Sequence, residues 1–260
     1  MCTVTWLRQE DGYDLFFNRD ELDRRAPERA PFRAEADGVP FLAPRDGDHD
    51  GTWLLVNHHG ITVCLLNDYS DPWQPEGASL HSRGAVVLAC AKARKVQDAL
   101  DLALRQPLER CRPFQMLAIA PGQDLQRLRW RGGRVIIDGS PSVQPPLSSS
   151  SWQADRVVTA RHAAYEHLVG SHEGALRPEH LQSYHESHDP RQGAESVLMR
   201  RADAATRSIT RVTATRRAIV MHYWPISRLP DAPSTAASHL TLIPAPPDRV
   251  APAAIKASME

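Results

Sequence analysis

The sequence predicts an α+β protein in which antiparallel sheets and helices form layers. Three observations predict it: a strand hairpin at the N-terminus, a second hairpin near residue 60, and helices followed by a three-strand meander between residues 85 and 138. Strands that are joined by tight turns pair antiparallel, whereas βαβ units would need a helix after each strand. The order of the elements therefore favours layered antiparallel sheets over a parallel sheet.

The first hairpin begins directly after Cys2. Thr3, Thr5 and Leu7 alternate with Val4 and Trp6, a period of two that is typical of a half-buried strand. Asp11-Gly12 predicts the turn, and residues 13–17 predict the returning strand. The returning strand would bring residues 18–21, Asn-Arg-Asp-Glu, back beside Cys2.

This arrangement would place a nucleophile beside groups that activate it. Removal of the initiator methionine would give Cys2 a free α-amine, whose pKa of about 7.7–8.0 allows it to accept a proton near neutrality. Arg19 would stabilise the thiolate, and Asp20 would accept a hydrogen bond from the α-ammonium and orient it. From the residues alone, a buried cysteine beside a charged turn is an equal alternative.

Composition limits the classes of function. The 260 residues carry 31 Lys and Arg against 31 Asp and Glu, so no general charge favours nucleic acid or an anionic membrane. No apolar run approaches the roughly 18 residues of a membrane-spanning helix. The charged N-terminus lacks the apolar core of a secretory signal, and we expect a cytoplasmic protein with a reduced Cys2 thiol. Cys64, Cys90 and Cys111 are widely spaced and are expected to be packed, unpaired thiols.

Residues 22–45 are rich in charge and proline and predict a surface loop. Asp46, Asp48 and Asp50 imitate the opening of a calcium-binding loop, but Asn57 stands where that loop needs a glutamate. An Asp/Gly turn without metal is the better interpretation.

The middle of the chain predicts regular elements. Residues 52–56 and 61–66 form the second hairpin, 85–91 and 96–104 have helical apolar spacing, and three strands follow over 114–120, 125–130 and 134–138. The serine- and proline-rich residues 140–151 are interpreted as a long loop at the rim of the active site.

Residues 154–188 predict two helices that contain six histidines, namely His162, His167, His172, His180, His185 and His188. Metal or haem binding is one alternative, but no metal-site spacing is present, and a solvated histidine-rich surface is favoured. Strands are predicted over 196–200 and 208–223, with a turn near residue 215. Residues 226–260 are expected to be an extended tail in which 239–243 add a short strand.

The N-terminal pattern resembles a known family. Met-Cys at the start, the Asp11-Gly12 turn and the Asn-Arg-Asp-Glu of residues 18–21 resemble the NRDE family, also called transport and Golgi organisation 2-like proteins. They are also similar to the start of bile salt hydrolases and penicillin V acylases, and both groups are placed in the N-terminal nucleophile (Ntn) hydrolase superfamily. Three shorter motifs also resemble the family: Gly-Thr-Trp-Leu at 51–54, Ser-Arg-Gly at 82–84 and Thr-Arg-Ser at 206–208.

The resemblance implies a four-layer αββα sandwich formed by residues 1–260 as one domain. It implies that Cys2 is the nucleophile, that Asn67 holds the oxyanion, and that Arg207 faces the nucleophile or binds substrate. The other site residues that it implies are Arg19 and Asp20 as catalytic residues and Asn18, Glu21, Trp53 and Ser149 as supporting residues. Ser149 marks a departure, because relatives carry Leu-Ser-Asn where this chain has Leu-Ser-Ser.

The expected function is that of a cysteine amidohydrolase or acyltransferase that acts on a linear C–N amide bond of a small molecule. This function needs no cofactor and no metal, and it implies no nucleic-acid or membrane partner; a homo-oligomer is possible. A non-enzymatic protein that binds or traffics a small molecule or haem in the same pocket is the alternative. A structural scaffold on the same fold is a third reading, favoured by the missing asparagine at Ser149.

Overall fold

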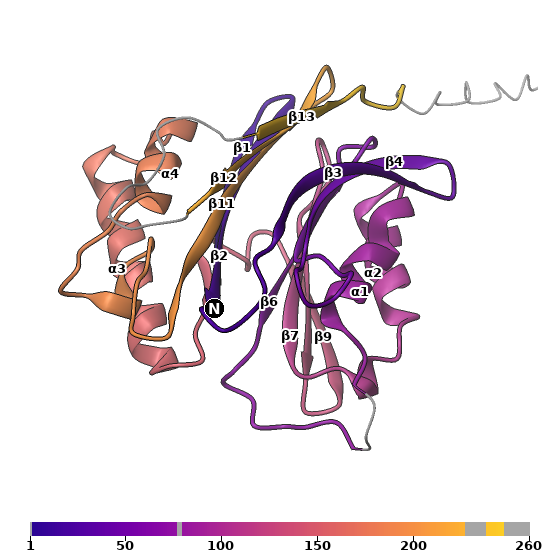
Figure 1. The fold of residues 1–260 in the computed structure, drawn as a ribbon. Helices are drawn as coiled ribbons and strands as arrows, with labels where there is room; N and C mark the ends of the chain where they lie inside the picture. The colour runs from indigo at the N-terminus through magenta and orange to yellow at the C-terminus, as the bar shows by residue number, and fades with distance from the viewer. Residues whose placement is uncertain (1, 77–79, 227–237, 247–260) are drawn as a thin grey trace, which may run out of the picture.

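Two sheets and four α-helices form four layers in the computed structural model, which describes residues 2–76, 80–226 and 238–246 (Figure 1). Sheet A contains, in spatial order, β10 (Leu147–Ser149), β1 (Cys2–Gln9), β2 (Gly12–Leu22), β11 (Ala204–Thr215), β12 (Ile219–Pro225) and β13 (Ser238–Leu242). Sheet B contains β3 (Arg29–Ala36), β4 (Val39–Arg45), β5 (Leu54–Asn57), β6 (Thr62–Asn67), β7 (Phe114–Ile119), β8 (Gln126–Arg131) and β9 (Arg134–Gly139).

Helices cover the outer face of each sheet. Helices α3 (Ala154–Ser171) and α4 (Pro178–His185) lie against sheet A, and α1 (Arg83–Ala89) and α2 (Val96–Leu104) lie against sheet B (Figure 1). Short 3-10 turns are Cys90–Lys92, Leu108–Arg110 and Gly193–Glu195. All strand pairs are antiparallel, as the predicted α+β sandwich requires.

Three large apolar clusters hold the layers together, and a fourth, small one contains Met199 and Ala204. The first lies between the two sheets and includes Val4 and Leu54, the second joins sheet B to α1 and α2, and the third joins sheet A to α3 and α4. Successive side chains of β1 point to opposite faces of sheet A. Val4 and Trp6 pack in the cluster between the two sheets, while Thr3 and Thr5 face helices α3 and α4. The period of two is confirmed, but the prediction of a half-buried strand is wrong, because Thr3 and Thr5 are also fully buried under the helices.

The first hairpin turns one residue earlier than predicted. Gln9 pairs with Gly12, so Glu10 and Asp11 form the turn, and Gly12 begins β2. A Cβ atom at Gly12 would collide with the backbone carbonyl of Ala214 in β11, so only glycine fits here.

The prediction of a loop over residues 22–45 is wrong, because β3 and β4 form a hairpin there. Prolines are tolerated here because β3 is an edge strand, and its pairing with β4 is irregular between Arg29 and Phe32, where Pro31 lies. A strand over 196–200 is also absent, since Arg200 makes only an isolated bridge to Ala205. The rim loop, in contrast, contains the short strand β10, which pairs with β1.

The remaining predicted elements are present. The hairpin near residue 60, the helices, the meander and the long β11–β12 hairpin lie close to their predicted bounds. Strand β13 confirms the short strand near 239–243, whereas residues 227–237 and 247–260 of the predicted tail lie outside the described residues.

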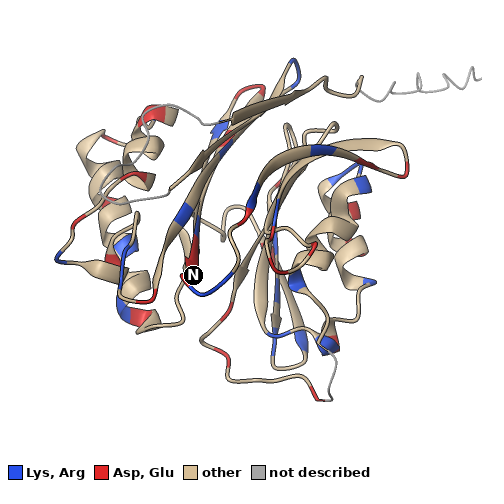
Figure 2. Ribbon diagram, viewed as in Figure 1, with Lys and Arg blue, Asp and Glu red and all other residues tan. Residues whose placement is uncertain are grey.

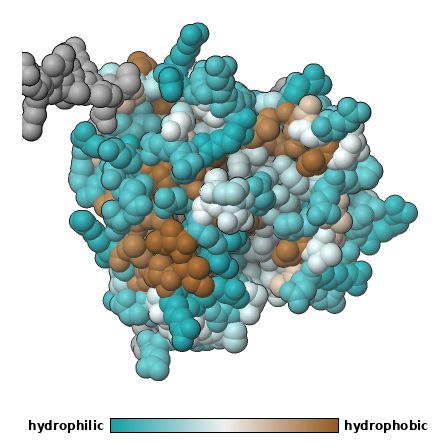
Figure 3. Space-filling view, turned by 180° about the vertical axis from the view of Figure 1, so that it is seen from behind, coloured by the Kyte–Doolittle hydropathy of each residue, from teal (hydrophilic) through white to brown (hydrophobic). Residues whose placement is uncertain are grey.

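Charges are mixed over the surface. Basic and acidic residues are interspersed along both sheets and meet beside the N-terminus (Figure 2). Seen from behind, an apolar patch lies on the side of the molecule that carries sheet B (Figure 3), and strand β9 at the edge of this sheet exposes Val135, Ile136 and Ile137. None of the helices in the described part of the chain is both long and apolar enough to cross a membrane.

Buried polar contacts fix α4 on sheet A. The side-chain amide of Asn18 donates to the carbonyl oxygens of His185 (2.9 Å) and Val197 (3.0 Å). The His185 ring bonds Asn18 Oδ1 through Nδ1 (2.7 Å) and Thr5 Oγ1 through Nε2 (2.8 Å). Burial lowers the pKa of His185 to about 3, and the nearby Arg161 charge adds to the effect, so the ring is neutral.

We expect His185 to make folding pH-dependent. Its folded pKa lies below the unfolded value of about 6.5, so its contribution is complete above pH 6.5 and declines as the pH falls toward 3. From pH 7 to pH 5 this group should remove about 2 kcal/mol from the free energy of unfolding, measured by urea denaturation. His185→Gln should flatten this dependence, whereas His167→Gln, at an exposed position, should not. Equal pH profiles for both variants would contradict this account.

Candidate functional site

A pocket of about 460 Å³ opens at the end of β1 where Cys2 begins the strand. Both sheets contribute to it, as do the segment before α1 and the loop that precedes β7. Its lining residues are Cys2, Arg19, Asp20, Glu21, Arg25, Asp46, His49, Gly51, Thr52, Trp53, Leu65, Asn67, Leu80, His81, Ser82, Arg83, Gly84 and Arg112. Most of the residues that the sequence analysis assigned to a site are therefore neighbours in space.

Cys2 lies between two neighbouring strands at the pocket. It pairs with Arg19 of β2 on one side and with Ser149 of β10 on the other. Only 9% of its surface is exposed, and burial raises the pKa of its thiol. A hydrogen bond from the Asp20 backbone and the Arg19 charge both lower this pKa, but burial outweighs them.

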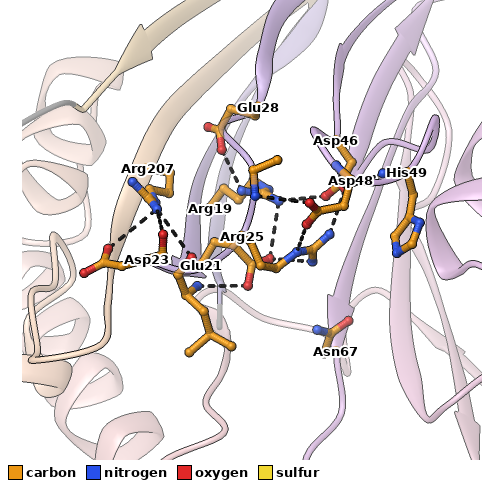
Figure 4. A network of polar contacts seen from close by, with 12 residues as sticks. Arg19, Glu21, Asp23, Arg25, Glu28, Asp46, Asp48, His49, Asn67 and Arg207 are labelled. Carbon is orange, nitrogen blue, oxygen red and sulfur yellow. Dashed lines mark hydrogen bonds and ion pairs between the residues drawn. The ribbon is translucent and has the colours of Figure 1, made fainter.

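Arg19 is held by carboxylates on three sides (Figure 4). Its guanidinium contacts Glu28 (2.6 Å), Asp46 (2.8 Å) and Glu21 (3.3 Å), and it stacks on the Trp53 ring at 4.4 Å. These carboxylates raise the pKa of Arg19 although burial lowers it. The positive charge expected to favour the Cys2 thiolate is thus largely compensated by its neighbours.

Arg25 extends the same network toward solvent. It contacts Glu21 (2.9 Å), Asp46 (2.7 Å) and Asp48 (2.6 Å) (Figure 4). Asp46 also accepts hydrogen bonds from the backbone of Asp48 and His49, as in an Asx turn. Asp46 and Asp48 thus bind Arg25, and Asp46 also binds the backbone of the turn.

Asp20 is joined to a residue that the sequence analysis missed. Its Oδ2 accepts hydrogen bonds from both terminal nitrogens of Arg161 (3.1 Å each), and its Oδ1 accepts one from Thr206 (2.7 Å). Arg161 projects from α3, is completely buried, and also donates to Thr3 Oγ1 (2.6 Å) and the Ala194 carbonyl (3.0 Å). The sequence alone does not distinguish the buried Arg161 from an exposed arginine such as Arg156 on the same polar helix.

Asn67 and Ser149 both line a cavity beside the Cys2 pocket, and Asn67 lines the Cys2 pocket as well. Asn67 ends β6 and lines the pocket, and its side-chain amide donates to the Tyr69 hydroxyl (2.7 Å). Ser149 lies opposite Cys2 in the strand register and lines a neighbouring cavity of about 500 Å³ that also contacts Asn67. The Ser149 hydroxyl is buried and has no hydrogen-bond partner among the residues that the structure describes.

Arg207 does not line the Cys2 pocket. The register of β11 shifts between Thr206 and Ser208, at Arg207 itself. The guanidinium of Arg207 contacts the carbonyl oxygens of Leu22 and Asp23 and the Asp23 carboxylate at 3.6 Å (Figure 4). The expectation that this arginine faces the nucleophile is therefore not met, because the bulge directs it to the end of β2. Asn18 is likewise absent from the lining, since its amide anchors α4.

The helix-region histidines do not form a site at this pocket. None of the six lines it, and the surface interpretation is wrong for His185, which is fully buried. His49 and His81 are the imidazoles at the pocket. Within the described ranges, no group of three or more metal-ligating side chains is close enough to hold an ion. Cys64, Cys90 and Cys111 are buried and free, as predicted, and burial raises the pKa of each.

The buried pair between Asp20 and Arg161 should be essential for stability. Arg161→Met leaves Asp20 as a buried charge without its main cation, and we expect the free energy of unfolding to fall by about 3–5 kcal/mol. Arg156 is the matched control on the same helix, because it pairs with Glu195 while 67% of its side chain is exposed. Arg156→Met should cost at most about 1 kcal/mol. Urea denaturation measures both, and similar losses would refute this assignment.

Comparisons with known proteins agree with this architecture. The family model described as Transport and Golgi organisation 2 matches residues 1–146, more than half of the chain. A solved structure of a conjugated bile acid hydrolase from Clostridium perfringens is similar with a TM-score of 0.52 at 9% identity, covering 94% of this chain and 92% of that one. An N-acylethanolamine-hydrolyzing acid amidase ortholog from Caenorhabditis elegans gives 0.58 at 11% identity, covering 93% and 100%. A search of curated proteins finds no match.

At these identities the solved structures establish the fold and leave the activity open. Two antiparallel sheets between helical layers, with a cysteine at the start of the first strand, form the αββα sandwich of the Ntn hydrolases. The chain belongs to the Transport and Golgi organisation 2 family and has the Ntn hydrolase fold.

Proposed function

We propose that this protein is an N-terminal-cysteine amidohydrolase or acyltransferase that acts on a linear C–N amide bond of a small molecule. The observation that carries the proposal is the position of Cys2, whose thiol lines a pocket large enough for a small molecule. Asp20, Arg19 and Asn67 line the same pocket. A nucleophile that lines a pocket together with charged and amide groups supports acyl-transfer chemistry.

The reaction requires that Met1 is removed, so that Cys2 carries a free α-amine. This amine takes the thiol proton, and the sulfur forms a C–S bond to the amide carbonyl carbon. The C–N bond then breaks, and the leaving amine takes the proton back from the α-ammonium. Water, or another acceptor in a transferase, attacks the resulting thioester and restores the thiol.

The raised pKa of Cys2 gives the amine an essential role. Burial keeps the thiol protonated at neutral pH, so an unassisted thiolate is scarce. The α-amine, with an ordinary pKa near 7.7–8.0, is partly neutral and close to the sulfur by covalent connection. Proton transfer within one residue thus compensates for the buried position of the thiol.

Asn67 and Ser149 are the proposed donors to the oxyanion. The Asn67 amide would exchange its bond to Tyr69 for one to the developing negative charge. The buried Ser149 hydroxyl has no described partner and lies beside Cys2 in the sheet, so it would replace the amide that relatives carry at this position.

Intact-mass measurement tests the nucleophile. We expect purified protein to lack Met1 and to gain one acyl group when treated briefly with p-nitrophenyl acetate, with the adduct mapped to Cys2. Cys2→Ala should gain none, and Cys64→Ser, which removes another buried thiol, should still gain one. Retention of Met1, or an adduct that persists in Cys2→Ala, would contradict the proposal.

Asn67→Ala should slow the acylation of Cys2 by about 10²-fold, because one oxyanion donor is lost. Tyr69→Phe is the matched control, since it removes only the hydroxyl that receives the Asn67 amide. The rate of adduct formation by mass spectrometry should be unchanged or higher in Tyr69→Phe. Equal slowing in both variants would assign Asn67 a structural role.

A binding protein without hydrolysis is the second candidate. The compensated charge of Arg19 and the raised pKa of Cys2 both favour it. If the ligand is haem, the ligand types at the pocket are the Cys2 thiol and the imidazoles of His49 and His81, and not the helix-region histidines. A Soret band that shifts in Cys2→Ala, with Met1 retained, would support this function instead.

A further inference from the structure

The arginines of the pocket differ in their pairing. Arg19 and Arg25 are each bound by three carboxylates. Arg83 and Arg112 also line the pocket, but neither forms an ion pair with a carboxylate in the described ranges. The hydrogen bond of Arg83 is to the backbone carbonyl of Pro113, at 3.3 Å. This wall therefore carries positive charge that no described acidic side chain compensates.

The two unpaired arginines influence one another electrostatically. Burial lowers the pKa of Arg83, and the charge of Arg112 lowers it further. A cation that is half-buried beside a like charge is destabilised until an anion joins it. Arg83 and Cys2 line the same pocket.

Arginines of the neighbouring cavity show the usual arrangement. Arg127 and Arg129 both bind Asp138, at 2.8 and 2.9 Å, and Arg131 binds Asp68 at 2.9 Å. The three arginines and Asp68 line the neighbouring cavity, which Asn67 also lines. Arg83 and Arg112 differ from these arginines because no described carboxylate neutralises their charge at the Cys2 pocket.

We infer that Arg83 and Arg112 bind an oxyanion, a carboxylate or a phosphate, that the substrate carries in addition to its amide. A guanidinium offers two parallel N–H donors that match such a group. Trp53, Leu65 and Leu80 supply apolar contacts within the same pocket. That the substrate is an amide rests on the proposed function. The substrate class is then a small amide that also carries an anionic group, and this group is unchanged by the reaction.

Iodoacetate and iodoacetamide test the anion site directly. Both alkylate a thiol by the same step, in which a C–S bond forms, iodide leaves and the thiol proton passes to buffer, and they differ chiefly in charge. We expect Arg83→Gln and Arg112→Gln each to lower the ratio of the iodoacetate rate to the iodoacetamide rate at Cys2 by about tenfold. Loss of a positive charge near the thiol lowers the thiolate fraction for both reagents alike, so the ratio of the two rates isolates the anion site. Arg134→Gln, at an exposed position on β9, should leave the ratio unchanged.

Intact mass with peptide mapping measures these rates. An unchanged ratio in the Arg83→Gln/Arg112→Gln double variant overturns the inference. Arg112 is exposed, so its variant keeps the test valid if Arg83→Gln fails to fold. 

A binding measurement covers the case in which Cys2 does not react with either reagent. Calorimetric titration of Cys2→Ala with hippurate and with the neutral N-benzoylglycinamide should show tighter binding of hippurate, and Arg112→Gln in this background should remove the difference. Phenyl phosphate, titrated in parallel, distinguishes phosphate from carboxylate as the preferred oxyanion. Equal affinity for charged and neutral probes overturns the inference.

Neither measurement requires hydrolysis. If the protein prefers the anionic probes but never cleaves an amide, the anion site is supported and the proposed function is refuted. If the protein cleaves neutral and anionic amides equally well, the proposed function is supported and the anion site is refuted.

Discussion

The buried ion pair between Asp20 and Arg161 is the contact on which the site depends. It joins α3 of the outer layer to β2 at the level of the pocket, and through Thr3 and Thr206 it also reaches β1 and β11. Three strands and a helix are thus fixed relative to one another by this one ion pair and the two threonines bound to it. Because a buried charge without its partner is costly, small displacements of these elements are penalised. The pair therefore gives Cys2 a rigid support, although Arg161 itself does not line the pocket.

The arginines that line the pocket differ in whether a carboxylate neutralises their charge. Carboxylates hold Arg19 and Arg25 and leave little net charge for the thiol. Arg83 and Arg112, in the same lining, form no ion pair with a described carboxylate. A compensated wall and a charged wall would orient an anionic molecule in one direction across Cys2. A chain with no net charge can thus carry uncompensated positive charge at one pocket.

Local patterns explain why much of the fold was predictable. Alternation at residues 3–7 and the glycine turn that follows defined the first hairpin, and a four-residue word at its end located Arg19 and Asp20 beside Cys2. Prolines concealed the β3–β4 hairpin, because an edge strand tolerates them and a sequence pattern does not reveal which strand is at the edge. Arg161 and the bulge at Arg207 depend on contacts between distant segments, which no local spacing encodes.

Sheet A also has a consequence for how the chain folds. Strand β2, from the start of the chain, pairs on one side with β11, from near its end, and Asp20 lies opposite Thr206. Pairings so distant in sequence close a long loop and slow folding. During synthesis, the first hairpin must wait for almost the whole polypeptide before its free edge is covered. Formation of the pocket is therefore a late event, and truncation before β11 would leave Cys2 on an unsupported hairpin.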